Sequence, residues 1–389
     1  MAINDGGSRF EDERLRKVRF AVLKITHRCN LNCSYCYEEP APATDMDLAT
    51  FRLLTSRIIS SSRHPLIRFV LHGGEPSLVS ADWLTEAVDF IDTEARIFRK
   101  TVKVGMQSNL LPLDEAKLCL LKRLGVRIGA SIDGPADLPG SMRPFAGKAI
   151  ETYRLARDLG VRIGILMTIN SSNWDQYGRI MPWLREELGV DWFRANPVTP
   201  VGRGKDLPPM APEQVFQAGK DIIEAMIRTE GGILEETIFR EMERFVRPGG
   251  QPEPDSLCNS RECGAGAAVI CITPEGNLLP CGRFSWNETD YLLGHLGDEP
   301  SAVEASRFEA TRKRLQQATP ESFADCDACE AKSICSFGCK AFIVRSRARV
   351  NVECRPIRLR YEYYRENRPQ VERLVASAAM RSGDLPGPL

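Results

Sequence analysis

The chain has 389 residues, of which 52 are basic and 52 are acidic, in the proportions of an ordinary soluble protein. Its length predicts two or three domains with a sizeable core. The balanced charge gives no electrostatic reason to expect nucleic acid or a membrane surface as a partner. No stretch approaches eighteen uninterrupted apolar residues, and the first seventeen residues lack the apolar core of a signal peptide. We expect a cytoplasmic protein with no nucleic-acid partner and no membrane association.

Strand-like and helix-like segments alternate over the first half of the chain. Strands are expected at 18–26, 66–72, 102–106, 126–132, 161–169 and 191–196, and helices at 82–96, 113–124, 150–159 and 174–188. This alternation predicts a parallel sheet with right-handed crossovers. About six such units give an α/β fold, a partial (β/α)6 TIM-like barrel, which we place at 18–235 after an N-terminal extension at 1–17.

Three cysteines lie within eight residues just after the first strand, in Cys29-Asn-Leu-Asn-Cys33-Ser-Tyr-Cys36-Tyr37. The chain has thirteen cysteines and no export signal, and the cytosol keeps thiols reduced, so disulfides explain them poorly. Three thiolates on one loop bind iron or zinc and leave a fourth coordination position open, which is a catalytic arrangement. A few buried thiols are the alternative interpretation.

Polar and glycine-rich residues follow the next strands at the points where those strands end. Gly73-Gly74-Glu75-Pro76 follows the second strand, Ser108-Asn109 the third, and Ser131-Ile-Asp133-Gly134 the fourth. Parallel barrels place their active sites at these strand ends. We therefore expect the cofactor-binding residues of the barrel there.

A second, cysteine-rich unit is expected at 257–360, after a linker at 236–256 that is rich in proline and glycine towards its end. Its cysteines are Cys258, Cys263, Cys271, Cys281, Cys326, Cys329, Cys335, Cys339 and Cys354. Cys271 lies in an apolar, strand-like run, and Cys119 lies in a helical pattern, so both are expected to pack in the core. The others indicate clustered metal ligands, and two zinc ribbons are one possibility. Residues 361–389 are expected to form a terminal helix and tail.

The first cysteine loop resembles the CxxxCxxC signature of the radical S-adenosylmethionine (radical SAM) superfamily, including the aromatic Tyr37 after the third cysteine. The resemblance implies that Cys29, Cys33 and Cys36 hold a four-iron, four-sulfur (4Fe-4S) cluster whose unique iron binds S-adenosylmethionine. One electron then cleaves this cofactor to a 5′-deoxyadenosyl radical, which abstracts a hydrogen atom from the substrate.

The same resemblance implies further contacts with S-adenosylmethionine. Gly73, Gly74 and Glu75 match the segment that contacts the methionine amino group. Ser131 and Arg143 match residues that bind the methionine carboxylate, for which a guanidinium is suited because it forms two parallel hydrogen bonds. A solvated surface arginine is the alternative for Arg143. The expected cofactor contacts are Tyr35, on the adenine side, and Gly73, Gly74, Glu75, Ser108, Asn109, Ser131 and Arg143.

The C-terminal cysteines resemble the SPASM domain of radical SAM enzymes that modify peptides and proteins. That domain holds two auxiliary 4Fe-4S clusters. The resemblance assigns Cys258, Cys263, Cys281 and Cys339 to one cluster, here called the first auxiliary set. It assigns Cys326, Cys329, Cys335 and Cys354 to the other, the second auxiliary set. Full ligation leaves no open iron, so these clusters are expected to pass electrons or to hold the fold.

The leading functional hypothesis is a radical SAM enzyme that abstracts a hydrogen from a residue of a ribosomally made precursor peptide and gives a cross-link or an oxidised side chain. An external one-electron donor such as flavodoxin or ferredoxin is implied. Formylglycine formation on a sulfatase is an alternative, although in those maturases an aspartate follows the equivalent of Cys281, whereas this chain has Gly282-Arg283. A non-catalytic electron carrier or scaffold is a third hypothesis, opposed by the expected cofactor pocket. No catalytic base is identified. Only about seventeen residues precede the first strand, so a leader peptide is expected to dock on the barrel, on 197–256 or through a separate partner.

Overall fold

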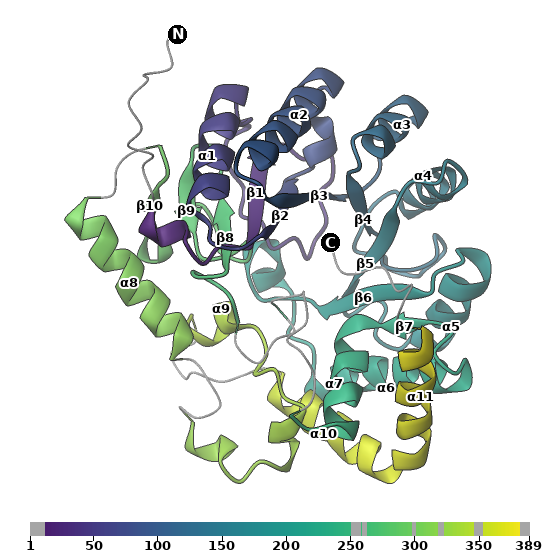
Figure 1. The fold of residues 1–389 in the computed structure, drawn as a ribbon. Coiled ribbons are helices and arrows are strands. Elements are labelled where there is room, and N and C mark those ends of the chain that lie inside the picture. The colour runs from purple at the N-terminus through teal and green to yellow at the C-terminus, as the bar shows by residue number, and fades with distance from the viewer. Residues whose placement is uncertain are drawn as a thin grey trace.

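The computed structural model describes residues 12–249, 258, 263–297, 301–317, 323–345 and 353–381. Its centre is one curved sheet of ten strands in the order β10-β9-β8-β1-β2-β3-β4-β5-β6-β7. The strands β1 to β7 and β8 pair in parallel, whereas β8, β9 and β10 pair antiparallel. Helices α1 to α4 follow the outer side of the curved sheet, as expected for a partial barrel (Figure 1).

The strands are β1 (Phe20–Thr26), β2 (Leu66–Gly73), β3 (Thr101–Ser108), β4 (Arg127–Ser131), β5 (Ile163–Ile169), β6 (Trp192–Pro197), β7 (Leu234–Glu235), β8 (Val269–Ile272), β9 (Asn277–Leu279) and β10 (Gly294–His295). The helices are α1 (Leu48–Ser61), α2 (Ala81–Ile97), α3 (Glu115–Arg123), α4 (Ala146–Asp158), α5 (Tyr177–Pro182), α6 (Pro212–Arg228), α7 (Glu236–Val246), α8 (Ala302–Gln316), α9 (Lys340–Ile343), α10 (Cys354–Glu366) and α11 (Arg368–Arg381).

The predicted α/β fold with a partial parallel barrel is confirmed, and all six predicted barrel strands are present. Three features differ from the prediction. Helix α1 was not predicted, a seventh strand follows the predicted last one, and the helix expected at 174–188 is an α-helix that continues as a π-helical turn at Trp183–Glu187.

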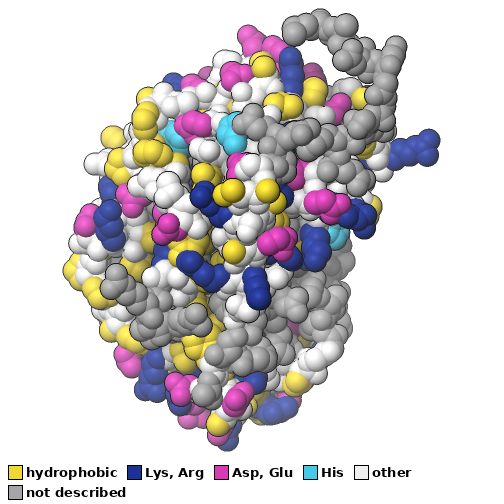
Figure 2. Space-filling view, turned by 90° about the vertical axis from the view of Figure 1, so that its left-hand side faces the viewer, with side chains coloured by type: hydrophobic (Ala, Val, Ile, Leu, Met, Phe, Trp, Pro, Cys, Tyr) yellow, Lys and Arg dark blue, Asp and Glu magenta, His cyan; other side chains and the backbone are white. Residues whose placement is uncertain are grey.

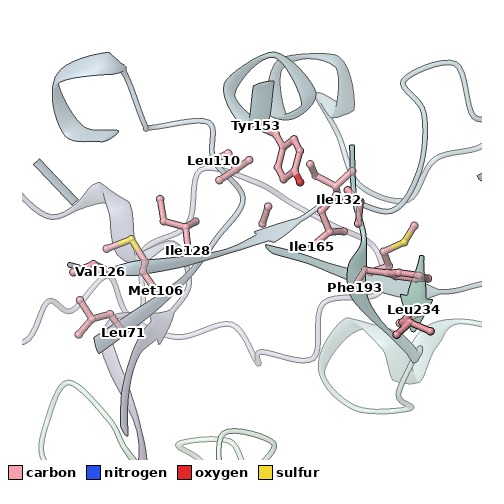
Figure 3. Close-up of a cluster of buried hydrophobic side chains, with 14 of the residues drawn as sticks. Leu71, Met106, Leu110, Val126, Ile128, Ile132, Tyr153, Ile165, Phe193 and Leu234 are labelled. Atoms are coloured by element: carbon pink, nitrogen blue, oxygen red, sulfur yellow. The ribbon is translucent and has the colours of Figure 1, made fainter. Parts of the chain in front are cut away.

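The outward side chains of the barrel strands form the main core. Leu71, Met106, Ile128, Ile165 and Phe193 come from successive strands and are almost fully buried. Figure 3 shows them in one continuous apolar layer. Burial of this layer is what holds the helices on the outside of the sheet.

The inner face of the barrel is more polar than the outer face. Because side chains alternate along a strand, Val22 and Lys24 point away from the layer that buries Leu23. The register places Lys24 opposite His72, and Leu166 opposite Arg194. TIM-like barrels are usually filled with branched apolar side chains, so Lys24, His72 and Arg194 mark the interior as a place for chemistry.

The cysteine-rich unit is joined to the barrel through the sheet itself. Strand β8 pairs in parallel with β1 over Phe20–Leu23 and Val269–Ile272, so the hairpin β8–β9 extends the barrel sheet. Gly276 has a φ of +90° in the turn of this hairpin, a conformation that favours glycine.

The predicted linker at 236–256 is wrong in its first half, which is helix α7. Ile238, Phe239, Met242 and Phe245 repeat at helical spacing and are buried, so this segment packs as an amphipathic helix. The Pro- and Gly-rich part at 250–256 lies outside the described residues.

The predicted terminal helix is instead two helices, α10 and α11, and it begins earlier, at Cys354. Both pack on α6 and α7 (Figure 1). Arg360 forms two hydrogen bonds with the buried Glu241 carboxylate, at 2.6 and 2.7 Å. The C-terminal segment is therefore part of the barrel's helical layer rather than a loose tail.

On the face shown in Figure 2, Lys and Arg side chains are interspersed with Asp and Glu, and hydrophobic side chains are scattered between them. Among the described residues, no helix combines the length and apolarity that a bilayer crossing requires.

Candidate functional site

The first cysteine loop follows the C-terminal end of β1, where the sequence predicted it. Cys33 is buried and Cys29 is exposed, with Cys36 between these extremes. Burial raises the pKa of Cys33 to about 11, and the neighbouring thiols of Cys36 and Cys29 act in the same direction, whereas Arg143 opposes it. The three predicted ligands are therefore electrostatic neighbours on one loop.

A segment after β6 holds this loop in place. The backbone N–H of Arg203 donates to the carbonyl of Cys36 at 2.8 Å, and its Nε donates to the carbonyl of Cys33 at 3.0 Å. A Cβ on Gly202 would lie 2.4 Å from the Cys36 carbonyl oxygen, so only glycine fits there. The sequence analysis missed Arg203, although the Gly-Arg-Gly triplet at 202–204 marks a tight approach of two backbones.

Gly73 and Gly74 pack against the end of β1. The N–H of Gly74 donates to the Thr26 carbonyl at 2.9 Å, and the next N–H donates to the Arg28 carbonyl at 2.7 Å. A Cβ on Gly73 would lie 2.0 Å from the Thr26 oxygen, and one on Gly74 would lie 2.2 Å from the Arg28 oxygen. These glycines fix the start of the cysteine loop, in addition to any cofactor contact.

Glu75 is buried and joins the ends of β2 and β3. Its Oε1 accepts hydrogen bonds from the Ser77 N–H at 3.1 Å, the Ser77 hydroxyl at 2.5 Å and the Ser108 hydroxyl at 2.8 Å. Its Oε2 accepts from the Asn109 N–H at 2.6 Å. The Asn109 amide in turn donates to Asn30 of the cysteine loop at 2.8 Å. Glu75, Ser108 and Asn109 thus form one network that positions the loop.

Tyr35, Asp133 and Arg143 form a compact cluster beside Cys33. The Asp133 carboxylate accepts from the Tyr35 hydroxyl and, at 3.1 Å, from Arg143 Nε. The Arg143 guanidinium lies over the Tyr35 ring, 5.5 Å from its centroid, and its side chain is only 13% exposed. Ser131 and Arg143 line one small hollow together. Arg143 is therefore not a solvated surface arginine, and its main partner, Asp133, was not among the predicted site residues.

The first auxiliary set surrounds a small core next to β1. Burial raises the pKa of Cys263 to about 12, with Cys258 and Cys339 acting in the same direction. Burial likewise raises the pKa of Cys281, whose neighbours are the other three thiols of the set. The four side chains are thus brought together from positions up to 81 residues apart in the sequence.

The second auxiliary set lies towards α10. Burial raises the pKa of Cys326, and the Cys354 and Cys329 thiols add to this effect. Burial also raises the pKa of Cys335 to about 12, again with Cys354 as a neighbour. By contrast, Cys271 on β8 is fully buried, and Lys24 and Glu38 are the charged groups that act on it.

Several predicted ligands share one local geometry, in which the backbone N–H two residues further on donates to the sulfur. Leu31 N–H donates to Cys29 at 3.4 Å, and Phe337 N–H donates to Cys335 at 3.2 Å. The same relation holds for Cys263, Cys281 and Cys339. Such N–H donors stabilise thiolates, which are the form that binds metal.

Among the described residues, no three His, Cys, Asp or Glu side chains are spaced to hold a single metal ion. In a 4Fe-4S cluster each thiolate binds a different iron, so the sulfurs lie farther apart than the ligands of one ion. The grouping of the thiols and their N–H donors fit such a cluster.

A second polar cluster, which the sequence analysis missed, lies on the inner face of β1 and β2. The buried Lys24 ammonium donates to Glu38 Oε2 at 2.8 Å and to the Phe284 carbonyl at 3.2 Å. His72 accepts the Gly73 N–H at Nδ1, at 2.7 Å, so its Nε2 carries the proton that points to the Tyr37 hydroxyl at 3.1 Å. This cluster connects the cysteine loop with the turn that follows Cys281.

Residues 23–184 match the Radical SAM superfamily. This stretch, which contains the first cysteine loop and the barrel from β1 to α5, is therefore a radical SAM domain.

Among curated proteins, the chain is 27% identical to an uncharacterized protein of Archaeoglobus fulgidus, over 84% of this chain and 75% of that protein. It is 23% identical to the antilisterial bacteriocin subtilosin biosynthesis protein AlbA of Bacillus subtilis, over 71% of this chain and 57% of AlbA. It is 25% identical to the mycofactocin maturase MftC of Mycolicibacterium smegmatis, over 82% and 77% of the two chains.

Among solved structures, anSMEcpe with bound AdoMet is similar with a TM-score of 0.74 and 16% identity, covering 92% of this chain and 99% of that chain. Streptococcus suis SuiB bound to its precursor peptide SuiA is similar with a TM-score of 0.58 and 13% identity, covering 85% and 74%. These structures support the same fold, including the region of the cysteine-rich unit.

Proposed function

We propose that the protein is a peptide-modifying radical SAM enzyme that acts on a ribosomally made precursor peptide and forms a cross-link or an oxidised side chain. The observation that carries the proposal is that Arg143 and the turn after Cys281 both reach the cysteine loop, with the Arg143 guanidinium beside Cys33 and that of Arg283 near the Tyr37 ring. The relatives named as a mycofactocin maturase and a subtilosin biosynthesis protein, and the structure of SuiB with a precursor peptide, support a peptide as the substrate.

Cys29, Cys33 and Cys36 would hold a 4Fe-4S cluster, which, with S-adenosylmethionine bound, supplies a 5′-deoxyadenosyl radical for hydrogen abstraction. Arg143 would bind the methionine carboxylate together with Ser131, with Asp133 holding the guanidinium in place from the other side. The hydrogen-bond network of Glu75, Ser108 and Asn109 would fix the position of the cysteine loop relative to the methionine pocket. Tyr35 would border the pocket next to Arg143.

The first and second auxiliary sets would each hold a further 4Fe-4S cluster. The grouping of the thiols within each set supports this. Free thiolates need a reducing compartment, so the proposal includes a cytoplasmic location and an external one-electron donor such as flavodoxin or ferredoxin.

Formylglycine formation is less well supported. The residue that follows Cys281 is Gly282, which has no side chain to serve as a base. Arg283 stays protonated, and the turn holds no carboxylate before Glu288.

The test is coexpression with short peptides encoded near this protein's gene, followed by mass spectrometry. A mass loss of two hydrogens, or another defined change, in one peptide supports the proposal when it disappears in the Cys29→Ala variant. A second readout is deuterium transfer from a labelled peptide into 5′-deoxyadenosine. No modified peptide and no transfer, from protein that cleaves S-adenosylmethionine, would contradict a peptide substrate.

A further inference from the structure

Arg283 is held firmly at its backbone. It follows Cys281-Gly282 in the turn after β9, and its carbonyl accepts a hydrogen bond from Arg345 Nη2 at 2.8 Å. Arg345 also pairs with Glu288 at 2.5 Å and lies over the Phe284 ring, 4.6 Å from its centroid. The start of the Arg283 side chain is therefore fixed by a second arginine that has its own partners.

The Arg283 guanidinium extends from this turn towards the first cysteine loop. Its carbon Cζ lies 5.2 Å from the centroid of the Tyr37 ring, and Tyr37 directly follows Cys36. Its Nη1 donates to the Thr199 hydroxyl at 3.4 Å, just after β6. It is also within electrostatic range of the Cys339 thiol. The cation thus lies between the first cysteine loop and the first auxiliary set.

Within the part of the chain that the structure describes, Arg283 has no carboxylate at ion-pair distance; its side-chain contacts are Thr199 and Tyr37. Two other cations near this turn differ, because Lys24 is paired with Glu38 at 2.8 Å and Arg345 is paired with Glu288 at 2.5 Å. Arg283 is therefore the cation of the three without a directly paired carboxylate, and Glu353 acts on it only from beyond ion-pair distance. Its charge does not depend on pH, because a guanidinium stays protonated in proteins.

A fixed cation next to a cluster stabilises the cluster's more negative, reduced state, most strongly where the effective dielectric constant is low. The N–H of Arg283 also donates to the Cys281 sulfur, and hydrogen bonds to ligand sulfurs act in the same direction. The guanidinium and the backbone N–H of Arg283 would thus both favour reduction of a cluster held by Cys281.

We propose that Arg283 raises the reduction potential of the cluster held by the first auxiliary set, so that this cluster accepts an electron from the substrate. This rests on the proposed function. In the step that Arg283 would serve, the substrate radical would lose one electron and release a proton to solvent, and the first auxiliary set would hold the cluster that takes up this electron. An external carrier of the flavodoxin or ferredoxin class would then receive the electron. Arg283 is a positioning residue and does not itself react.

The test measures potentials in reconstituted full-length protein by redox titration with electron paramagnetic resonance. The background carries Cys29→Ala, Cys33→Ala and Cys36→Ala, which leave only the auxiliary clusters. On this background Arg283→Gln is compared with Arg283→Lys, which keeps the charge, and with the control Arg312→Gln on α8, where the guanidinium pairs with Glu309.

We expect Arg283→Gln to lower one of two midpoint potentials, making reduction of that cluster about tenfold less favourable, which is 59 mV for a one-electron couple. Arg283→Lys is expected to retain most of the potential, and Arg312→Gln all of it. Unchanged potentials in Arg283→Gln, or equal shifts in Arg283→Gln and Arg283→Lys, would overturn the inference while leaving the clusters intact. Absence of iron from the background protein would refute the auxiliary clusters themselves, and with them both proposals.

Discussion

Replacement of Gly74 by alanine tests whether the glycines after β2 hold the cysteine loop. The new Cβ would lie 2.2 Å from the Arg28 carbonyl oxygen, and 2.6 Å from the carbonyl carbon behind it. Real Cβ contacts are essentially never shorter than 3.0 Å, so one of the two backbones must move by at least about 0.8 Å. Overpacking of this kind costs about 1–3 kcal/mol of stability.

The displacement falls on Arg28, one residue before Cys29, and it breaks the hydrogen bonds of Gly74 to Thr26 and of Glu75 to Arg28. We therefore expect Gly74→Ala to lose most of the iron of the first cluster after reconstitution, with a matching loss of 5′-deoxyadenosine formation. The assay is iron analysis together with chromatography of the cleavage products, and chemical denaturation reports the stability.

The matched control is Gly178→Ala. Gly178 lies in α5 with open space around the position of a Cβ, and its φ is not positive, so alanine there is expected to be neutral or slightly stabilising. Full iron content and full cofactor cleavage in Gly74→Ala would refute the packing role assigned to the glycines.

Three further predictions concern other parts of the molecule. Arg360→Met leaves the Glu241 carboxylate buried without its bidentate partner. We expect the free energy of unfolding, measured by urea denaturation, to fall by about 3–5 kcal/mol. A loss below about 1 kcal/mol would contradict the buried pair. The lysine of Arg143→Lys cannot form two parallel hydrogen bonds with a carboxylate. We therefore expect S-adenosylmethionine to bind about 10- to 100-fold more weakly in equilibrium dialysis. An unchanged dissociation constant would show that Arg143 does not bind the cofactor. Burial lowers the pKa of His72 to about 4 from its ordinary 6.5. Between these pH values the unfolded chain binds a proton on His72 and the folded chain does not, so the free energy of unfolding falls as the pH drops from about 6.5 to 4. The His72→Gln variant should lose less stability over this range than the wild type, and equal slopes would show that His72 is not responsible.

The barrel was predictable because its strands are apolar runs that end in glycine or polar residues, and β1 to β6 carry that pattern clearly. Strand β7 is only two residues long and offers no pattern of its own. Helix α1 was missed although its signal is present: Asp47 caps its first turn, and Phe51, Leu54 and Ile58 repeat at helical spacing. Helix α7 was taken for a linker because the prolines and glycines that follow it dominated the interpretation of the segment.

The residue types of the site were visible in the sequence, but their partners were not. Glu75 was predicted as a cofactor contact, whereas its carboxylate also receives donors from Ser77, Ser108 and Asn109. Asp133 and Arg203 reach the cysteine loop from segments about 100 and 170 residues away. Such contacts depend on which strand ends lie next to each other, and a single sequence does not specify the lateral order of charged side chains around a barrel.

Iron content and S-adenosylmethionine cleavage, measured together on anaerobically reconstituted protein with dithionite, test the central claim most directly. The account predicts about twelve irons per chain, from three clusters of four, and release of 5′-deoxyadenosine that is lost when Cys29, Cys33 and Cys36 are replaced by alanine. Zinc in place of iron, with no cleavage of S-adenosylmethionine, would contradict it.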